Sequence, residues 1–179
     1  MLKLDNTALA IVDIQGKLAG LMHEKDKLFE NAIKMIKGAQ VLELPILWNE
    51  QVPDKLGETI PQVKKLFAQI RPMSKSSFSC CGNEDFIKAL TQTRRKQIIV
   101  IGIETHICVY QTVIDLLNAS YEVYVAADAV SSRTMENKHI GLTTMKDAGA
   151  KITSVEMSLF EILRKAGGDR FKQISKIVK

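Results

Sequence analysis

The fold is decided by the stretch from Gln97 to Cys108, which reads QIIVIGIETHIC. Residues 97–101 predict a strand that is apolar on both faces, as expected for a strand in the middle of a parallel sheet. A turn follows from Gly102 to Thr105, and helical spacing of apolar residues predicts a helix over residues 105–118. A strand, a tight turn and a helix in this order can present a nucleophile at the start of the helix.

The chain on both sides of this stretch repeats the alternation of strands and helices. Further strands are expected at residues 7–12, 46–48, 121–126 and 151–154. Further helices are expected at residues 25–44, 61–70, 83–93, 136–148 and 156–166, with a loop at residues 51–59. This alternation predicts an α/β fold of three layers, α-β-α, around a mainly parallel, Rossmann-like sheet. Without a linker or repeat, residues 1–179 are expected to form a single domain.

Composition narrows the class of protein. The net charge of +5 suits anionic substrates, and binding of nucleic acid is an alternative that rests on this charge alone. The basic residues are spread over predicted helix faces, so we expect a solvated surface and no nucleic-acid partner. No apolar run approaches the roughly 18 residues of a membrane span, and the first residues do not resemble a signal peptide. We therefore expect no membrane association and a cytoplasmic location.

The cysteines and histidines argue against a disulfide framework and a metal site. The three cysteines, Cys80, Cys81 and Cys108, form an odd and sparse set, which indicates reduced thiols. The histidines are His23, His106 and His139. Neither set has zinc-ligand spacing, so we expect no metal and no cofactor. Cys80 and Cys81 are interpreted as structural or incidental, with a redox-sensitive role as the alternative.

Three side chains that can do chemistry stand at or near predicted strand ends, where ligands bind in open α/β sheets. Asp13 follows the first strand; its alternative role is to stabilise a loop or cap a helix. With Thr105 as the helix N-cap, Cys108 lies in the first turn, where free N–H groups stabilise a thiolate; the alternative is a buried core thiol. The ammonium of Lys75 would lower the pKa of a neighbouring thiol. The alternative is that Lys75 is solvated, as a single lysine in a loop usually is.

Taken together, these segments resemble the signature of the isochorismatase-like cysteine hydrolase superfamily. The matching segments are DIQ (13–15), KSSFS (75–79), GIETHICV (102–109), DAVSSR (128–133) and GAKITSVEMSLF (149–160). The resemblance runs from about residue 7 to residue 160, in the order that the family has, and the cysteine segment is its most specific part.

The resemblance implies a role for each matching residue. Cys108 would be the nucleophile, Asp13 the general base and Lys75 the cation that stabilises the pair. The family's cis peptide bond would fall between Ile103 and Glu104. The backbone N–H groups of Glu104 and Cys108 would then form the oxyanion hole.

One departure from the family pattern bears on metal use. Nicotinamidases of this family carry an Asp-x-His motif after the second strand, where this chain has Asn49-Glu50-Gln51. No histidine lies between His23 and His106, so the chain is most similar to the metal-free branch: isochorismatase-domain-containing proteins and bacterial relatives.

Several side chains near these motifs are candidates for the substrate pocket. They are Gln15, Trp48, Asn49, Phe78 and Thr105. Trp48, Phe78 and also Tyr110 are equally compatible with the core. His106 stands two residues before Cys108, and residues at that spacing on a helix do not face each other, so we expect a supporting or surface residue.

These features predict a cysteine-dependent hydrolase, an amidase or related C–N hydrolase, that acts on a small molecule through a thioester-type intermediate. The alternative is a binding or assembly protein that retains the fold without useful turnover. The intact set of Asp13, Lys75 and Cys108 argues against that alternative. By resemblance, we also expect a homo-oligomer, a dimer or larger.

Overall fold

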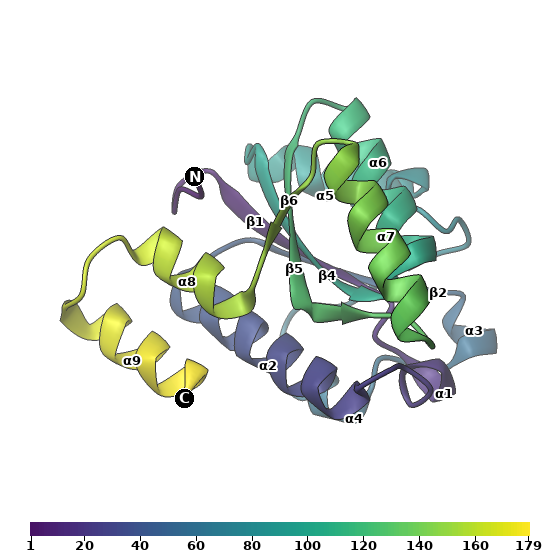
Figure 1. Ribbon diagram of the computed structural model, residues 1–179, viewed down its shortest axis with the longest axis horizontal. Coiled ribbons are helices and arrows are strands. Elements are labelled where there is room, and N and C mark those ends of the chain that lie inside the picture. Colours follow the sequence, from purple (N-terminus) through teal and green to yellow (C-terminus); the bar gives the residue numbers. More distant parts are fainter.

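A sheet of six parallel strands forms the centre of the molecule, and helices cover both of its faces (Figure 1). The computed structural model describes all residues from 1 to 179. The strands are β1 (Thr7–Val12), β2 (Ile46–Gln51), β3 (Met73–Lys75), β4 (Gln97–Ile103), β5 (Glu122–Ser131) and β6 (Lys151–Thr153). Their order across the sheet is β3-β2-β1-β4-β5-β6, and every pairing is parallel. The expected three-layer α/β architecture is confirmed.

The helices divide the interior into two apolar cores, one on each face of the sheet. They are α1 (Gly16–Ala19), α2 (Lys25–Val41), α3 (Pro53–Leu56), α4 (Pro61–Lys64), α5 (Glu84–Thr93), α6 (Tyr110–Asn118), α7 (Met135–Asp147), α8 (Val155–Leu163) and α9 (Gly168–Val178). Helices α2, α8 and α9 lie on one face, and α5, α6 and α7 on the other (Figure 1). Along β4, Ile99 and Ile101 enter the first core while Ile98 and Val100 enter the second. None of the helices combines the length and apolar character that crossing a bilayer requires.

The strand order reverses between β1 and β4. The chain builds β1, β2 and β3 outward in one direction and then crosses back to place β4 on the free side of β1. These two strands pair over their full common length, from Thr7 opposite Gln97 to Val12 opposite Gly102. In open parallel sheets the carboxyl ends at such a reversal leave a crevice in which ligands bind. Residues that follow Val12 and Ile103 therefore face each other there.

The structure differs from the sequence-based expectations mainly at the β2–β3 edge of the sheet. Strand β3 has only three residues, too few to show a periodic pattern, and was not predicted. The helix expected over residues 61–70 ends at Lys64. Beyond it, Phe67 stacks on Trp48 with 4.6 Å between ring centroids, so apolar contact continues without helical geometry.

The helix after β4 also begins differently from the prediction. Residues Thr105–Val109 form a π-helical turn, and regular α-helix starts at Tyr110. Thr105 is buried, and its hydroxyl has no hydrogen-bond partner. The expected role of Thr105 as a helix N-cap is therefore wrong. The wider π-helical turn is of a kind that is frequent at functional sites.

Gly102 allows β4 to lie against β1 at the reversal. Its φ is +128°, and a Cβ atom there would lie 1.9 Å from the carbonyl oxygen of Val12. We expect Gly102→Ala to lower the free energy of unfolding by about 3 kcal/mol or more, because the backbone of β1 or β4 must shift to make room for the new Cβ atom. Gly149→Ala is the matched control: φ is +107° but nothing lies within 4 Å, so strain alone should cost about 1–2 kcal/mol. Urea unfolding measures both; equal losses would contradict the steric explanation.

Candidate active site

Cys108 lies in the π-helical turn directly beyond the carboxyl end of β4. Its side chain is almost fully buried, with the residue 8% exposed, and it lines a small pocket that opens to solvent. The peptide bond between Ile103 and Glu104, just before the turn, is cis. This is the position at which the family resemblance places a cis bond. Glu104 and Cys108 line the same pocket.

Asp13 lies beside Cys108, directly after β1. Its backbone has a φ of +50°, the left-handed region that Asp tolerates better than most residues. One carboxylate oxygen, Oδ2, accepts a hydrogen bond of 2.7 Å from Lys75 Nζ. The other, Oδ1, is buried without a fully formed hydrogen bond. The Cys108 thiol is close enough for hydrogen bonding that lowers the pKa of Asp13 and raises its own. The sheet therefore brings Asp13, Lys75 and Cys108 together.

Lys75 ends β3 and reaches past β2 to Asp13. Its side chain has no exposed surface. Besides Asp13, the ammonium donates to Gln51 Oε1 at 2.5 Å, the Phe78 carbonyl at 3.0 Å and the Ser77 carbonyl at 3.2 Å. A buried charge needs such a set of partners. Every N–H of this ammonium is thus used within the protein.

Gln51 and Gln15 hold this arrangement in place. Gln51 presents Oε1 to Lys75 and donates from Nε2 to the Ser76 carbonyl at 2.9 Å. The Gln51 backbone N–H donates to Gln15 Oε1, and Gln15 Nε2 donates back to the Gln51 carbonyl. Gln51 was not assigned a role from the sequence. Its position as the last residue of β2 is the signal that identifies it, because strand ends in this sheet converge on one edge.

The protonation states of Asp13 and Cys108 follow from their burial and their neighbours. Burial raises the pKa of Asp13, and Lys75 opposes that rise. Burial raises the pKa of Cys108 to about 12, and the negative charge of Asp13 adds to the rise while Lys75 opposes it. Desolvation therefore opposes the stabilisation of a thiolate that was expected at the helix start, and it favours a thiol at Cys108 beside the Asp13 carboxylate.

The pocket beside Cys108 includes only some of the residues expected in it. Gln15 and Phe78 line it. Trp48 does not: it lies in the core against Phe67, and its Nε1 donates to Thr59. Asn49 is buried within the sheet and donates to the Ile11 carbonyl at 3.2 Å. Buried Thr105 also lies outside the lining, so the placement of Trp48, Asn49 and Thr105 in the pocket was wrong.

Glu104 has a partner that sequence reasoning did not identify. Its carboxylate, in a side chain that is only 6% exposed, accepts from the backbone N–H and from Nε of Arg133, both at 3.1 Å. Arg133 follows the end of β5, so this ion pair ties the turn after β4 to the neighbouring strand. His106 does not line the pocket, and its Nδ1 lies 2.9 Å from the Ser132 hydroxyl.

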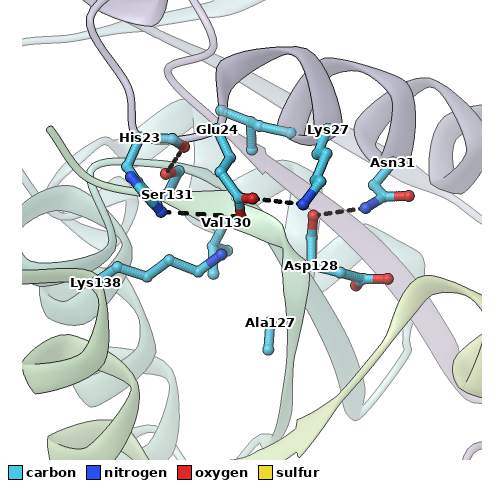
Figure 2. Close-up of a pocket in the computed structure, with 10 residues that line it drawn as sticks. His23, Glu24, Lys27, Asn31, Ala127, Asp128, Val130, Ser131 and Lys138 are labelled. Carbon is cyan, nitrogen blue, oxygen red and sulfur yellow. Dashed lines mark hydrogen bonds and ion pairs between the residues drawn. The ribbon is translucent and has the colours of Figure 1, made fainter. Parts of the chain in front are cut away.

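A second, more polar hollow of about 320 Å³ lies between the start of α2, the end of β5 and α7 (Figure 2). Within it, Glu24 pairs with Lys27, Asn31 donates to the Asp128 carbonyl, and Lys138 extends from α7 toward the interior of the hollow. The Ser131 hydroxyl donates to the His23 carbonyl at 2.7 Å. The lining contains no thiol, and its one hydroxyl is committed to structure. Of these two pockets, only the smaller one is lined by a thiol, that of Cys108.

The remaining cysteines lie near this site but outside the pocket. Cys80 is fully buried, and its backbone N–H donates to Thr112 Oγ1 at 2.9 Å. Burial raises the pKa of Cys81 to about 11. All three cysteines are free thiols. No three His, Cys, Asp or Glu side chains gather in a way that would hold a metal ion.

Comparison with known proteins agrees with this fold. The model of the isochorismatase domain matches residues 7–157. The chain is 34% identical to the "Secreted isochorismatase effector Isc1" of Phytophthora sojae over 97% of this chain and 85% of that protein. It is 33% identical to isochorismatase domain-containing protein 2A of Mus musculus, over 98% and 84% respectively.

Solved structures give the same result. A structure described as MAR1 ribonuclease from Caenorhabditis elegans superposes with a TM-score of 0.93 at 31% identity, covering 99% of this chain and 91% of that one. YcaC from Pseudomonas aeruginosa, determined with hexane-2,5-diol and covalent acrylamide, also gives 0.93, at 25% identity, with 99% and 89% covered. The extent of the domain match and the identity over the whole chain show that this protein belongs to the isochorismatase family of hydrolases.

Proposed function

We propose that this protein is a cysteine hydrolase that cleaves the C–N bond of a small amide, with Cys108 as nucleophile. One observation supports this most strongly. Asp13 binds Lys75 through Oδ2 at 2.7 Å and leaves Oδ1 without a full hydrogen bond beside the Cys108 thiol. An orphaned carboxylate oxygen next to a thiol in a pocket is suited to take and return a proton.

The reaction begins with the resting thiol. As substrate binds, the thiol proton passes to Asp13 while the sulfur adds to the carbonyl carbon, and the carbonyl oxygen becomes an oxyanion. Because burial raises the pKa of Cys108 to about 12, transfer to Asp13 accompanies the attack rather than precedes it. Lys75 compensates the negative charge of Asp13 before the transfer and takes no part in proton movement, since its N–H groups are all engaged.

The second half of the reaction releases both products. The oxyanion is held by the backbone N–H groups of Glu104 and Cys108. As it collapses, the C–N bond breaks, and the leaving nitrogen takes the proton from Asp13. This leaves a thioester on Cys108. A water molecule then attacks the thioester carbon and gives one proton to Asp13; that proton returns to sulfur as the carboxylic acid leaves.

The comparisons are compatible with a reactive nucleophile, and they also raise a second function. YcaC from Pseudomonas aeruginosa was determined with covalent acrylamide, an electrophile that modifies nucleophilic groups. The relative from Caenorhabditis elegans is described as a ribonuclease, which together with the net charge of +5 favours RNA as an alternative substrate. We favour the amide, because the pocket at Cys108 has a volume of about 100 Å³ and no uncommitted cation to hold a phosphate.

We also propose a cytoplasmic location and a homo-oligomer, a dimer or larger. Three free thiols suit a reducing compartment. Exposed apolar side chains such as Leu21, Met135 and Ile140 provide surface that association would cover.

The proposed nucleophile is tested by trapping the intermediate. When the protein turns over a small primary amide such as butyramide and is quenched in acid, we expect a butyryl adduct on the peptide that contains Cys108. Cys108→Ser should abolish both the thioester and ammonia release, whereas Cys81→Ser should retain them. Mass spectrometry of the peptides measures the adduct. Ammonia release that survives in Cys108→Ser would refute the assignment.

Replacing Asp13 separates the two roles given to it. Asp13→Asn removes a charge that raises the pKa of Cys108, so the thiol should titrate below its wild-type value of about 12. Turnover should nevertheless fall by about 10²-fold or more, because no group remains to protonate the leaving nitrogen. Asp147→Asn, on the exposed end of α7, is the isosteric control and should change neither. The alkylation rate of Cys108 against pH measures the first effect, and ammonia release measures the second.

The pH profile of turnover gives an independent check. Attack requires ionised Asp13, and burial raises the pKa of this carboxyl above its ordinary value. Activity should therefore fall as pH falls through that raised pKa, so the acid limb lies at a higher pH than for an ordinary aspartate. An acid limb at or below the ordinary aspartate value would contradict the role of Asp13.

The ribonuclease alternative is tested with a single-stranded oligoribonucleotide. We expect no cleavage by rigorously purified protein, and any binding at low salt should weaken steeply as salt rises, as for contacts to phosphates alone. RNA cleavage that is lost in Cys108→Ser would move the ribonuclease function to first place.

A further inference from the structure

The wall of the pocket beside Cys108 indicates which acyl groups it accepts. Apart from Cys108, half of the residues that line the pocket are apolar. They are Leu18, Leu56, Phe78, Ile103 and Ile107. Phe78 and Leu56 are 55% and 40% exposed, so they form the open mouth of the pocket. A substrate carbonyl at Cys108 would thus direct its carbon chain along an apolar surface.

The polar groups of the pocket are already engaged by the protein. Gln15 Nε2 donates to the Gln51 and Gly57 carbonyls, at 2.9 and 2.7 Å. Gln51 is used by Lys75 and Ser76, and the Glu104 carboxylate is used by Arg133. Apart from the two backbone N–H groups assigned to the oxyanion, no uncommitted side-chain donor of the lining is left to solvate a polar substituent on the acyl chain. A substituent of this kind would lose its water without replacement.

The charges at the pocket oppose an anionic substrate. The lining contains two carboxylates, Asp13 and Glu104, and no cationic side chain. The nearest ammonium, that of Lys75, has no exposed surface and four acceptors around it. It cannot turn toward a substrate carboxylate without leaving Asp13. The net charge of +5 suggested anionic substrates, but none of the positive charge lies in the lining of this pocket.

The volume sets an upper size. The pocket holds about 100 Å³. An apolar cavity of roughly 150 Å³ accommodates benzene, so about four or five heavy atoms fit beside the thiol. From these observations we infer that the substrates are amides of short, uncharged aliphatic acids, with the nitrogen substituent at the open mouth. This inference rests on the proposed function for its reaction, but the selectivity it describes belongs to the pocket.

The selectivity is tested first without turnover. Iodoacetamide and iodoacetate alkylate thiols with loss of iodide, have nearly the same size, and differ in charge. We expect the ratio of their rates at Cys108 to favour iodoacetamide at least tenfold more in the folded protein than at the same cysteine in the urea-unfolded chain. Peptide-resolved mass spectrometry separates Cys108 from Cys80 and Cys81. An unchanged or reversed ratio would overturn the inference.

Two substitutions that each introduce a positive charge test whether the pocket wall causes the preference for iodoacetamide. Leu56→Arg places a cation at the mouth and should reduce the preference for iodoacetamide by several fold. Met157→Arg is the matched control: the residue is 58% exposed on α8, outside the pocket lining, and the ratio should stay at the wild-type value. Phe78→Arg serves as the second mouth variant if Leu56→Arg fails to fold by circular dichroism. Equal effects of the mouth and α8 variants would refute a local cause.

Turnover then distinguishes the inference from the function on which it rests. Ammonia release is compared for butyramide, for succinamate, which adds a carboxylate, and for octanamide, which exceeds the pocket. We expect kcat/KM for butyramide to exceed that for each of the others by about 10²-fold. Succinamate or octanamide hydrolysed as well as butyramide would overturn the inference and leave the hydrolase intact. If none of the three amides releases ammonia while the alkylation ratio keeps its expected value, the amidase function would be overturned. The preference of the pocket for small uncharged molecules would still hold.

Discussion

The burial of one ammonium group constrains this end of the molecule more than any other interaction. Lys75 has no exposed side-chain surface and is satisfied only because Asp13, Gln51 and the carbonyls of Ser77 and Phe78 converge on it. Removing one partner of such a buried pair costs about 3–5 kcal/mol in typical proteins. The ends of β1 and β2 and the segment after β3 must therefore keep their relative positions. The left-handed backbone of Asp13 is one strained feature that this network can maintain.

The same network makes the reactivity of the thiol conditional. Lys75 occupies one oxygen of Asp13, and the other remains for Cys108. Because burial and Asp13 keep the pKa of Cys108 high, the sulfur is not a free thiolate in the resting protein. Oxidants and stray electrophiles react with thiolates, so the resting state is protected from them. In the proposed reaction, the proton transfer to Asp13 becomes favourable only when a substrate carbonyl carbon is close enough to form a bond with the sulfur.

How far the sequence predicts this site depends on the length and the direction of its strands. Asp13 and Cys108 could be placed because they follow mostly apolar, fully buried strands of six and seven residues, whose ends are easily recognised. Strand β3 has three residues and no such pattern, so a role for Lys75 beside Asp13 and Cys108 was implied only by family resemblance, and its burial was not predicted. Trp48 and Asn49 were misplaced because β2 is buried on both faces, and a pattern without polar alternation does not reveal where each side chain points. Gln51 was missed because the predicted strand stopped at Trp48, short of the true end of β2. Arg133 acts on Glu104, a residue 29 positions away in the chain, which spacing cannot indicate.

The pairing of β1 with β4 has a consequence for how the protein is made. Leu9 lies against Ile99, so Asp13 meets the cysteine turn only after the intervening strands and helices have been synthesised and the chain has crossed back over the sheet. Contacts between such distant segments form slowly and late in folding. The proposed set of Asp13, Lys75 and Cys108 can therefore be complete only after the chain has been made as far as Cys108 and β4 has paired with β1.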